Sequence, residues 1–301
     1  MNPATGRSRL AAWLDRNIKV VFLLPSVVFV VVMIAFPLVY NAALSLTTWS
    51  MSSVEPPRFV GLKNYAHLIL DSRFRNAVLR TLVYSFGSLA IEVTLGVALA
   101  IYLNRQFAGK STIKTALLLP MVMTPVAVGM TWLLILEPTI GLANHVLRLL
   151  SLPRLLWLGS RQTALLSLML VDVWEWTPVI AVITLSGLST LPVEPFESAR
   201  VDGANPWQIL RRITLPMISP TIVIATLLRL IDVLKTFDIV YSTTQGGPGF
   251  ATENINILGY LKAFQYFEFG SSASTLVVFF LMVFGATLAM IFLKNRLRLE
   301  Q

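Results

Sequence analysis

Long blocks of apolar residues alternate with shorter polar segments along almost the whole chain. Each block reaches about the 20 residues that an α-helix needs to cross the hydrocarbon core of a bilayer. The expected spans lie near residues 18–46, 80–103, 113–136, 163–188, 219–241 and 272–293. The pattern therefore predicts an all-α integral membrane protein with six transmembrane helices.

Two of the polar segments carry helix or turn signals. Residues 62–79 have apolar positions near helical spacing, which predicts a short surface helix ahead of the second span. Clustered glycine and proline at residues 245–249 predict a tight, ordered turn just beyond the fifth span.

The segment at 189–217 carries the strongest local signals. Proline suits the first turn of a helix, because its missing N–H has no partner there, so Pro192 and Pro195 predict a helix that runs to about Val201. Gly203 can adopt the left-handed backbone that ends such a helix. The chain is therefore expected to bend at this glycine.

A second helix is predicted directly after the bend. Asn205 followed by Pro206 is the signal of a capping residue and a first helical position. Leu215 and Pro216 are expected to end this helix before the fifth span begins. The segment should thus present a helix, a bend and a second helix at one face of the membrane.

Composition agrees with a membrane protein. The 301 residues are 55% hydrophobic and 13% charged, whereas soluble domains are about 25% charged. The net charge of +9 invites a nucleic-acid partner, but the basic residues are dispersed among the loops, so no nucleic-acid binding is expected. Cysteine is absent, and His67 and His145 stand alone. No metal site is therefore expected.

Lysine and arginine are distributed unequally between the two sides of the predicted bundle. The N-terminal tail, with Arg7, Arg9 and Arg16, shares one side with the loop after the second span, the 189–217 loop and the C-terminal tail. Together they hold more basic residues than the longer loops opposite. The positive-inside rule then predicts that both termini and the 189–217 loop are cytoplasmic.

The spacing in the 189–217 loop resembles a known motif. The order E-x-A-x3-G-x9-I-x-L-P resembles the cytoplasmic coupling loop of permease subunits in binding-protein-dependent ABC importers. The motif positions are Glu197, Ala199, Gly203, Ile213, Leu215 and Pro216, with Asp202 beside the glycine and Ser198 in place of a usual second alanine. The resemblance implies that this loop inserts as a coupling helix into a groove on an ATPase.

Further motifs extend the resemblance over about residues 20–290. The runs V-G-L-K-N-Y (60–65), G-L-A-N (141–144), W-E-W-T-P (174–178) and T-x-G-G-P (244–248) occur in the order seen in carbohydrate-uptake permeases. The chain looks closest to the maltose and glycerol-3-phosphate type. This implies one permease domain over residues 1–301, with type I ABC importer architecture, in the bacterial inner membrane.

The resemblance also implies partners. We expect a second permease subunit that is a distinct paralogue, two ABC ATPase subunits that bind ATP and Mg²⁺, an extracytoplasmic solute-binding protein and a sugar substrate. Residues 109–112 resemble the end of a phosphate-binding loop, but Asn104 stands where that loop requires glycine. This chain should therefore bind no cofactor, hold no catalytic residues and hydrolyse no ATP itself.

Seven ionisable residues lie inside the predicted spans, and five of them, Glu175 and the four of the fifth span, are candidate substrate contacts. Each costs roughly 2.5–3.5 kcal/mol at a helix centre, so they should pair, line a wet cavity or lie near an interface. The seven residues are Glu92, Asp172, Glu175, Arg229, Asp232, Lys235 and Asp238.

In the fifth span, charges of alternating sign recur every three residues at Arg229, Asp232, Lys235 and Asp238. Neighbours three apart meet on a helix, so each cation is expected to pair with the following acid on a stripe that faces the bundle interior. Such groups can bond sugar hydroxyls. The alternative is purely structural pairing or contact with another subunit, and the cations leave an anionic sugar open.

In the fourth span, Trp174, Glu175 and Trp176 lie near mid-membrane. Indole faces can stack on sugar rings while a carboxylate bonds their hydroxyls, although tryptophan in a membrane bundle also serves packing or interface anchoring. The main functional alternative is an ion-coupled secondary transporter that uses the intramembrane carboxylates. Such carriers usually show internal repeats and more spans, and neither is evident here. No motif supports an intramembrane enzyme.

Overall fold

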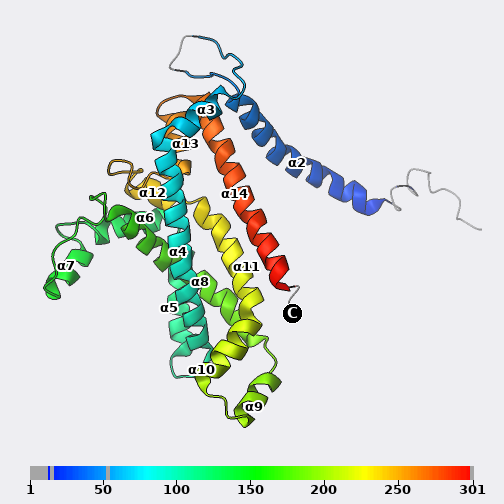
Figure 1. Ribbon diagram of the computed structural model, residues 1–301, viewed down its shortest axis with the longest axis vertical. Coiled ribbons are helices and arrows are strands. Elements are labelled where there is room, and N and C mark those ends of the chain that lie inside the picture. Colours follow the sequence, from blue (N-terminus) through cyan, green and yellow to red (C-terminus); the bar gives the residue numbers. More distant parts are fainter. Residues whose placement is uncertain (1–12, 14–16, 52–54, 299–301) are drawn as a thin grey trace, which may run out of the picture.

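The computed structural model describes residues 13, 17–51 and 55–298 (Figure 1). The basic residues Arg7, Arg9 and Arg16, which entered the orientation argument, lie outside these described residues. The helical segments are, in chain order, α2 (Ile18–Ser45), α3 (Lys63–Leu70), α4 (Ser72–Asn104), α5 (Lys110–Val122), α6 (Pro125–Ile135), α7 (Leu142–Leu149), α8 (Ala164–Ser189), α9 (Glu194–Val201), α10 (Pro206–Ile209), the π-helical turn η1 (Leu210–Thr214), α11 (Leu215–Leu234), α12 (Asp238–Thr243), α13 (Ile255–Phe264) and α14 (Phe269–Arg298).

The described part of the chain contains five helices that are long and apolar enough to cross a membrane. They are Ile18–Ser45, Ser72–Asn104, Ala164–Ser189, Pro206–Leu234 and Phe269–Phe292. The pair α5 and α6 passes the same test together but is bent by 101°, and counted as one broken span it gives a sixth. The predicted all-helical membrane fold is confirmed.

The centre of the bundle is the contact between α4 and α8, and α11 packs against both (Figure 1). Gly96 permits the close approach of α4, because a Cβ atom there would lie only 2.6 Å from the Cβ of Ile180 on α8. The helix α2 instead leaves the bundle, and its membrane-spanning window is uncovered within the chain (Figure 1). Its apolar surface is therefore available to lipid or to another subunit.

Three boundaries differ from the sequence-based expectation. The surface helix expected over 62–79 is only α3, because Asp71 interrupts the chain and its carboxylate accepts a hydrogen bond from the backbone N–H of Arg73 (2.8 Å). The second span thus starts at Ser72 rather than near residue 80. The third span breaks before Pro125, because a residue ahead of proline is disfavoured in helical geometry and Thr124 is extended.

A further difference concerns Leu215 and Pro216, which do not end the helix that begins at Pro206. The chain runs through the π-helical turn η1 directly into α11, with the backbone N–H of Leu215 bonded to the carbonyl of Leu210. This wider turn, just before Pro216, accommodates a ring that would otherwise clash with the preceding turn. Leu215 and Pro216, which were expected to end the helix, therefore lie within one long helix.

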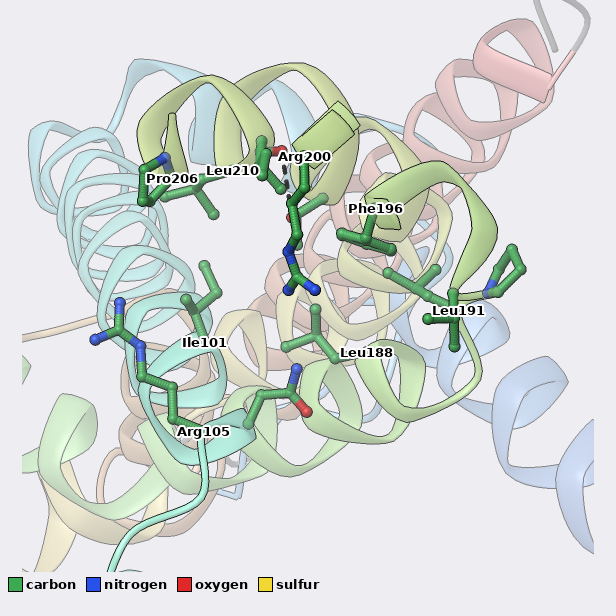
Figure 2. Close-up of a pocket in the computed structure, with 13 residues that line it drawn as sticks. Ile101, Arg105, Leu188, Leu191, Phe196, Arg200, Pro206 and Leu210 are labelled. Carbon is green, nitrogen blue, oxygen red and sulfur yellow. Dashed lines mark hydrogen bonds between the residues drawn. The ribbon is translucent and has the colours of Figure 1, made fainter. Parts of the chain in front are cut away.

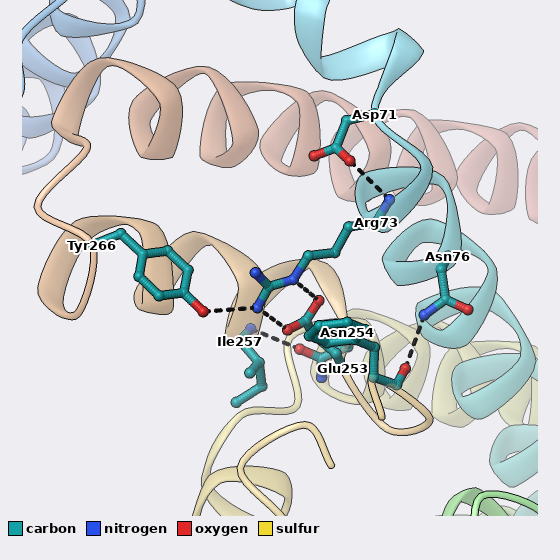
Figure 3. Close-up of polar contacts among 8 residues, drawn as sticks. Asp71, Arg73, Asn76, Glu253, Asn254, Ile257 and Tyr266 are labelled. Atoms are coloured by element: carbon teal, nitrogen blue, oxygen red, sulfur yellow. Dashed lines mark hydrogen bonds and ion pairs between the residues drawn. The ribbon is translucent and has the colours of Figure 1, made fainter. Parts of the chain in front are cut away.

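At the opposite end of the molecule from α9 and α10, the turn after α12 is fastened to α4 (Figures 1 and 3). The guanidinium of Arg73 donates to both carboxylate oxygens of Glu253, at 2.8 and 2.6 Å, and lies 4.4 Å from the ring centroid of Phe250. The Asn76 amide donates to the Phe250 carbonyl at 2.8 Å. Together with the hydrogen bond from the Thr252 hydroxyl to the carbonyl of Gly247 (2.7 Å), these contacts make the predicted turn an ordered one.

Candidate functional site

A buried cluster of charges joins the three central helices. Arg229 on α11 donates from Nε to Glu92 on α4 (2.7 Å) and from Nη2 to Asp172 on α8 (2.6 Å). The three side chains are at most 3% exposed. Because a buried charge is tolerated only when it is paired and hydrogen-bonded, this cluster fixes the relative positions of α4, α8 and α11.

The pairing predicted along the fifth span was wrong at both cations. Arg229 turns inward to Glu92 and Asp172 rather than to Asp232, which is about half exposed. Lys235 pairs with the preceding acid, Asp232, at 3.6 Å, and not with Asp238. For Lys235 the reason is that the helix ends at Leu234 and does not continue to Asp238. For Arg229 the reason is that the buried acids of α4 and α8 bind its guanidinium.

The fifth span breaks between Leu234 and Asp238, where α11 ends and α12 begins. Two asparagine side chains at the start of α13 satisfy backbone carbonyls of this break. The Asn254 amide donates to the carbonyl of Thr236 (2.7 Å), and the Asn256 amide donates to the carbonyl of Lys235 (2.9 Å). Irregular backbone at membrane depth is tolerated only with such partners or beside a water-filled cavity. The two asparagine hydrogen bonds therefore stabilise the break.

A cavity of about 250 Å³ opens at this break. Its lining residues come from α6, α8, α11, α12 and the break itself: Pro125, Asp172, Trp176, Arg229, Asp232, Lys235, Thr236, Phe237, Asp238 and Ile239. The cavity therefore gathers five of the seven residues predicted for the substrate pathway, namely Trp176, Arg229, Asp232, Lys235 and Asp238. It also lies where two broken spans meet, since Pro125 starts the second half of the bent pair.

Trp176 supplies the aromatic wall of this cavity. The guanidinium of Arg229 lies 4.8 Å from the Trp176 ring centroid, so the same cation that pairs with the buried acids also orients the indole. Phe237 stacks on Tyr241 at 5.2 Å between ring centroids. The cavity thus combines aromatic faces with charged hydrogen-bonding groups.

The structure does not bring the other two predicted residues to the cavity. Trp174 packs edge-on against Trp132 (5.5 Å between centroids) and lines a separate, mainly apolar cavity beside Pro120 and Pro178. Glu175 is buried, and neither carboxylate oxygen has a hydrogen-bond partner among the described residues. A helix turns about 100° per residue, so only one member of this adjacent trio faces the cavity.

Sequence reasoning did not assign five of the lining residues to the cavity: Pro125, Asp172, Thr236, Phe237 and Ile239. Asp172 was recognised only as an intramembrane charge. It lies four residues before Trp176, and this spacing could have placed both side chains on one helix face. Phe237 lies in the charged run itself, and Pro125 carries a helix-start signal that marks the break in the third span.

The 189–217 loop has the predicted helix, bend and helix. Gly203 follows α9 with a φ of +77°, the left-handed geometry that favours glycine. The Asn205 side chain accepts from the backbone N–H of Gln208 (2.9 Å), and the Gln208 side chain accepts from that of Asn205 (2.8 Å). This reciprocal pair fixes the start of α10.

The predicted coupling residues differ in exposure. Glu197, Asp202, Gly203 and Pro216 are exposed, whereas Ala199 and Leu215 are half-buried. A cavity of about 470 Å³ lies between this loop and the ends of α4 and α8 (Figure 2). The loop therefore presents acidic and small residues outward at one end of the molecule.

Comparison with known proteins decides the family. The family of inner membrane components of binding-protein-dependent transport systems matches residues 92–298. The chain belongs to this family. The resemblance found in the sequence is confirmed, and nothing in the family membership supports the ion-coupled alternative.

Relatives of this permease match it over nearly its whole length. A probable ABC transporter permease protein of Sinorhizobium fredii is 36% identical over 270 residues, which are 89% of this chain and 87% of that protein. A trehalose/maltose transport system permease protein of Thermococcus litoralis is 32% identical over 277 residues, 91% of this chain and 92% of that protein. These proteins are transport components and not enzymes by name.

The fold of the permease is found in a solved transporter. A chain in the crystal structure of a bacterial alginate ABC transporter, in complex with alginate pentasaccharide-bound periplasmic protein, superposes with a TM-score of 0.83 and 21% identity. The match covers 96% of this chain and 98% of that chain. It confirms the predicted ABC importer permease architecture.

The buried charge cluster generates a stability prediction. Replacing Arg229 with Gln leaves Glu92 and Asp172 buried without their cation, which should destabilise the permease by about 3–5 kcal/mol. Replacing Lys235 with Gln removes an ion pair whose side chains are 51% and 56% exposed, and should cost at most about 1 kcal/mol. The measurement is thermal unfolding of the purified transporter complex in detergent. Equal losses in the two variants would contradict the structural role of Arg229.

Proposed function

We propose that this permease is a membrane-spanning subunit of an ATP-driven importer that moves a sugar or sugar derivative into the cytoplasm. The observation that carries the proposal is the cavity at the break of the fifth span, where Trp176 and Phe237 stand beside Asp232, Lys235 and Asp238. Aromatic faces suit the apolar faces of sugar rings, and charged groups suit their hydroxyls. The names of relatives that transport trehalose, maltose and alginate support the same class of substrate.

Arg229 has a different role within this proposal from the one first assigned to it. Two carboxylates already occupy its guanidinium, so it positions Trp176 and the end of α11 rather than serving as a free cation. Lys235 and the acids at 232 and 238 are left to contact substrate. Trp174 and Glu175 face elsewhere and are not part of the proposed sugar site.

A second permease subunit would complete the cavity. Its volume of about 250 Å³ lies below the roughly 300–1,000 Å³ of sites that enclose small organic ligands. The uncovered apolar surface of α2 is a second place where a subunit could pack. We infer a distinct paralogue as this partner, together with an extracytoplasmic solute-binding protein that delivers the sugar.

The energy would come from two ABC ATPase subunits that hold ATP and Mg²⁺. We assign the contact to the outward surface of α9 and the bend that follows it. Glu197 and Asp202 are exposed carboxylates that can meet basic groups, while Ala199 and Gly203 permit close approach. Because α10, η1 and α11 form one continuous helix, movement of the loop, through Leu215 and Pro216, would reach the cavity at the far end of α11.

The test of this function is uptake by the complete complex reconstituted in liposomes. Sugar uptake should require ATP on the loop side and binding protein on the other, and should survive collapse of the proton gradient. Gly203→Val should abolish uptake and binding-protein-stimulated ATP hydrolysis, because a side chain at a φ of +77° distorts the bend. Uptake driven by the proton gradient without ATP would refute the proposal.

The matched control for this variant is Gly109→Val. Gly109 also has a positive φ, +84°, and open space around it, but it lies in the loop between α4 and α5. Both variants carry the same backbone strain, so a loss of uptake that is equal in both would argue against a coupling role for the bend at Gly203.

Orientation forms a separate proposal, that both termini and the 189–217 loop are cytoplasmic in the bacterial inner membrane. The chain has no cysteine, so single-cysteine variants of it can be labelled cleanly. Ala204→Cys should react with an impermeant thiol reagent only after the inner face is opened, and Gly249→Cys should react in intact cells. The reverse pattern would invert the topology and remove the coupling role of the loop.

A further inference from the structure

The cavity behind the 189–217 loop has a mixed chemistry that the transport proposal does not use (Figure 2). Its volume of about 470 Å³ is within the roughly 300–1,000 Å³ typical of sites for small organic ligands. Ile101, Leu188, Leu191 and Phe196 supply apolar walls. An amphiphilic ligand would find apolar surface here.

Two arginines give this cavity its charge. The guanidinium of Arg200 points from α9 into the cavity toward Leu188, and Arg105 reaches the opposite edge from the end of α4, beside Ile101 (Figure 2). Among the residues that the structure describes, no acidic one lines the cavity. Neither arginine side chain has an ionic partner within the described part of the chain. The unneutralised charge favours an anion.

The position of the cavity indicates that the anion is a lipid headgroup. The spanning helix α4 ends at Asn104 and the spanning helix α8 ends at Ser189, and the cavity lies at these two ends. The ends of membrane-spanning helices generally lie near the lipid headgroups. Basic pockets between helix ends on the cytoplasmic side suit the phosphate of anionic lipids.

We propose that this cavity binds an anionic phospholipid. Arg105 and Arg200 hold the phosphate, and the first methylene groups of the acyl chains lie against Ile101 and Leu188. The lipid would then act as a wedge between the ends of α4 and α8 and the back of the coupling loop. The site is separate from the sugar cavity, and lipid binding is measured without transport.

The experiment measures lipid binding to the purified complete complex by native mass spectrometry. Phosphatidylglycerol is titrated against the wild type and the double variant R105Q/R200Q, with phosphatidylcholine and inorganic phosphate as separate probes. Each basic residue beside an anionic lipid strengthens binding roughly fivefold, so losing both should weaken phosphatidylglycerol binding roughly 25-fold. Phosphatidylcholine should bind weakly to both proteins, and inorganic phosphate should not compete.

Two further variants keep the test decisive. R211Q/R212Q removes the same charge from exposed positions outside the cavity and should keep wild-type affinity. Ile101→Trp fills the apolar part while leaving both arginines, and should also weaken lipid binding. Wild-type affinity in R105Q/R200Q, or equal binding of phosphatidylcholine, would overturn the proposal. So would binding of inorganic phosphate as tight as that of the lipid, or loss of ATPase subunits from R105Q/R200Q with lipid binding intact.

Discussion

The guanidinium of Arg229 bridges carboxylates on two other membrane-spanning helices, and the arrangement of the bundle depends on this contact. Each ionised group at a helix centre costs roughly 2.5–3.5 kcal/mol in a bilayer, so Glu92, Asp172 and Arg229 are tolerable only together. Their hydrogen bonds, 2.6 and 2.7 Å long, leave little freedom for α11 to slide along α4 or α8. The same cation lies over Trp176 and so orients an aromatic wall of the cavity.

The broken fifth span follows from that anchorage. Because Arg229 fixes α11 just before its end, the next residues can leave helical geometry without loosening the bundle. The amides of Asn254 and Asn256 satisfy two carbonyls of the break, and the Arg73 and Glu253 contact holds this segment against α4. The result is a polar opening inside an otherwise apolar bundle, at the position where discontinuous helices bind substrates in other transporters.

Much of the fold was predictable from the sequence because its signals are local. Apolar blocks located the spans, and Gly203 with Asn205 and Pro206 located the bend of the loop, since left-handed geometry and capping depend on a few neighbouring residues. The break at Thr124 carried a proline signal that was not used. The end of the fifth span could not be predicted from local sequence signals, because residues 235–237 are unwound and bonded to residues about 20 positions later.

The candidate site was predictable in its members but not in their pairing. Spacing by three along a helix suggested that Arg229 would pair with Asp232, yet its partners lie 137 and 57 residues away in sequence. Spacing alone also cannot say which of three adjacent residues in the fourth span faces the cavity. A long-range ion pair decides the first question, and the packing of Trp174 on Trp132 decides the second.

The central claim is that the opening at the break of the fifth span lies on the path of the substrate. It is tested most directly by the rate at which Lys235→Cys, in this cysteine-free chain, reacts with a small water-soluble thiol reagent in the reconstituted complex. The rate should fall when sugar-loaded binding protein and ATP with vanadate trap the complex, while the rate for Trp174→Cys should not change. An unchanged rate at position 235, or protection at position 174 instead, would contradict the claim.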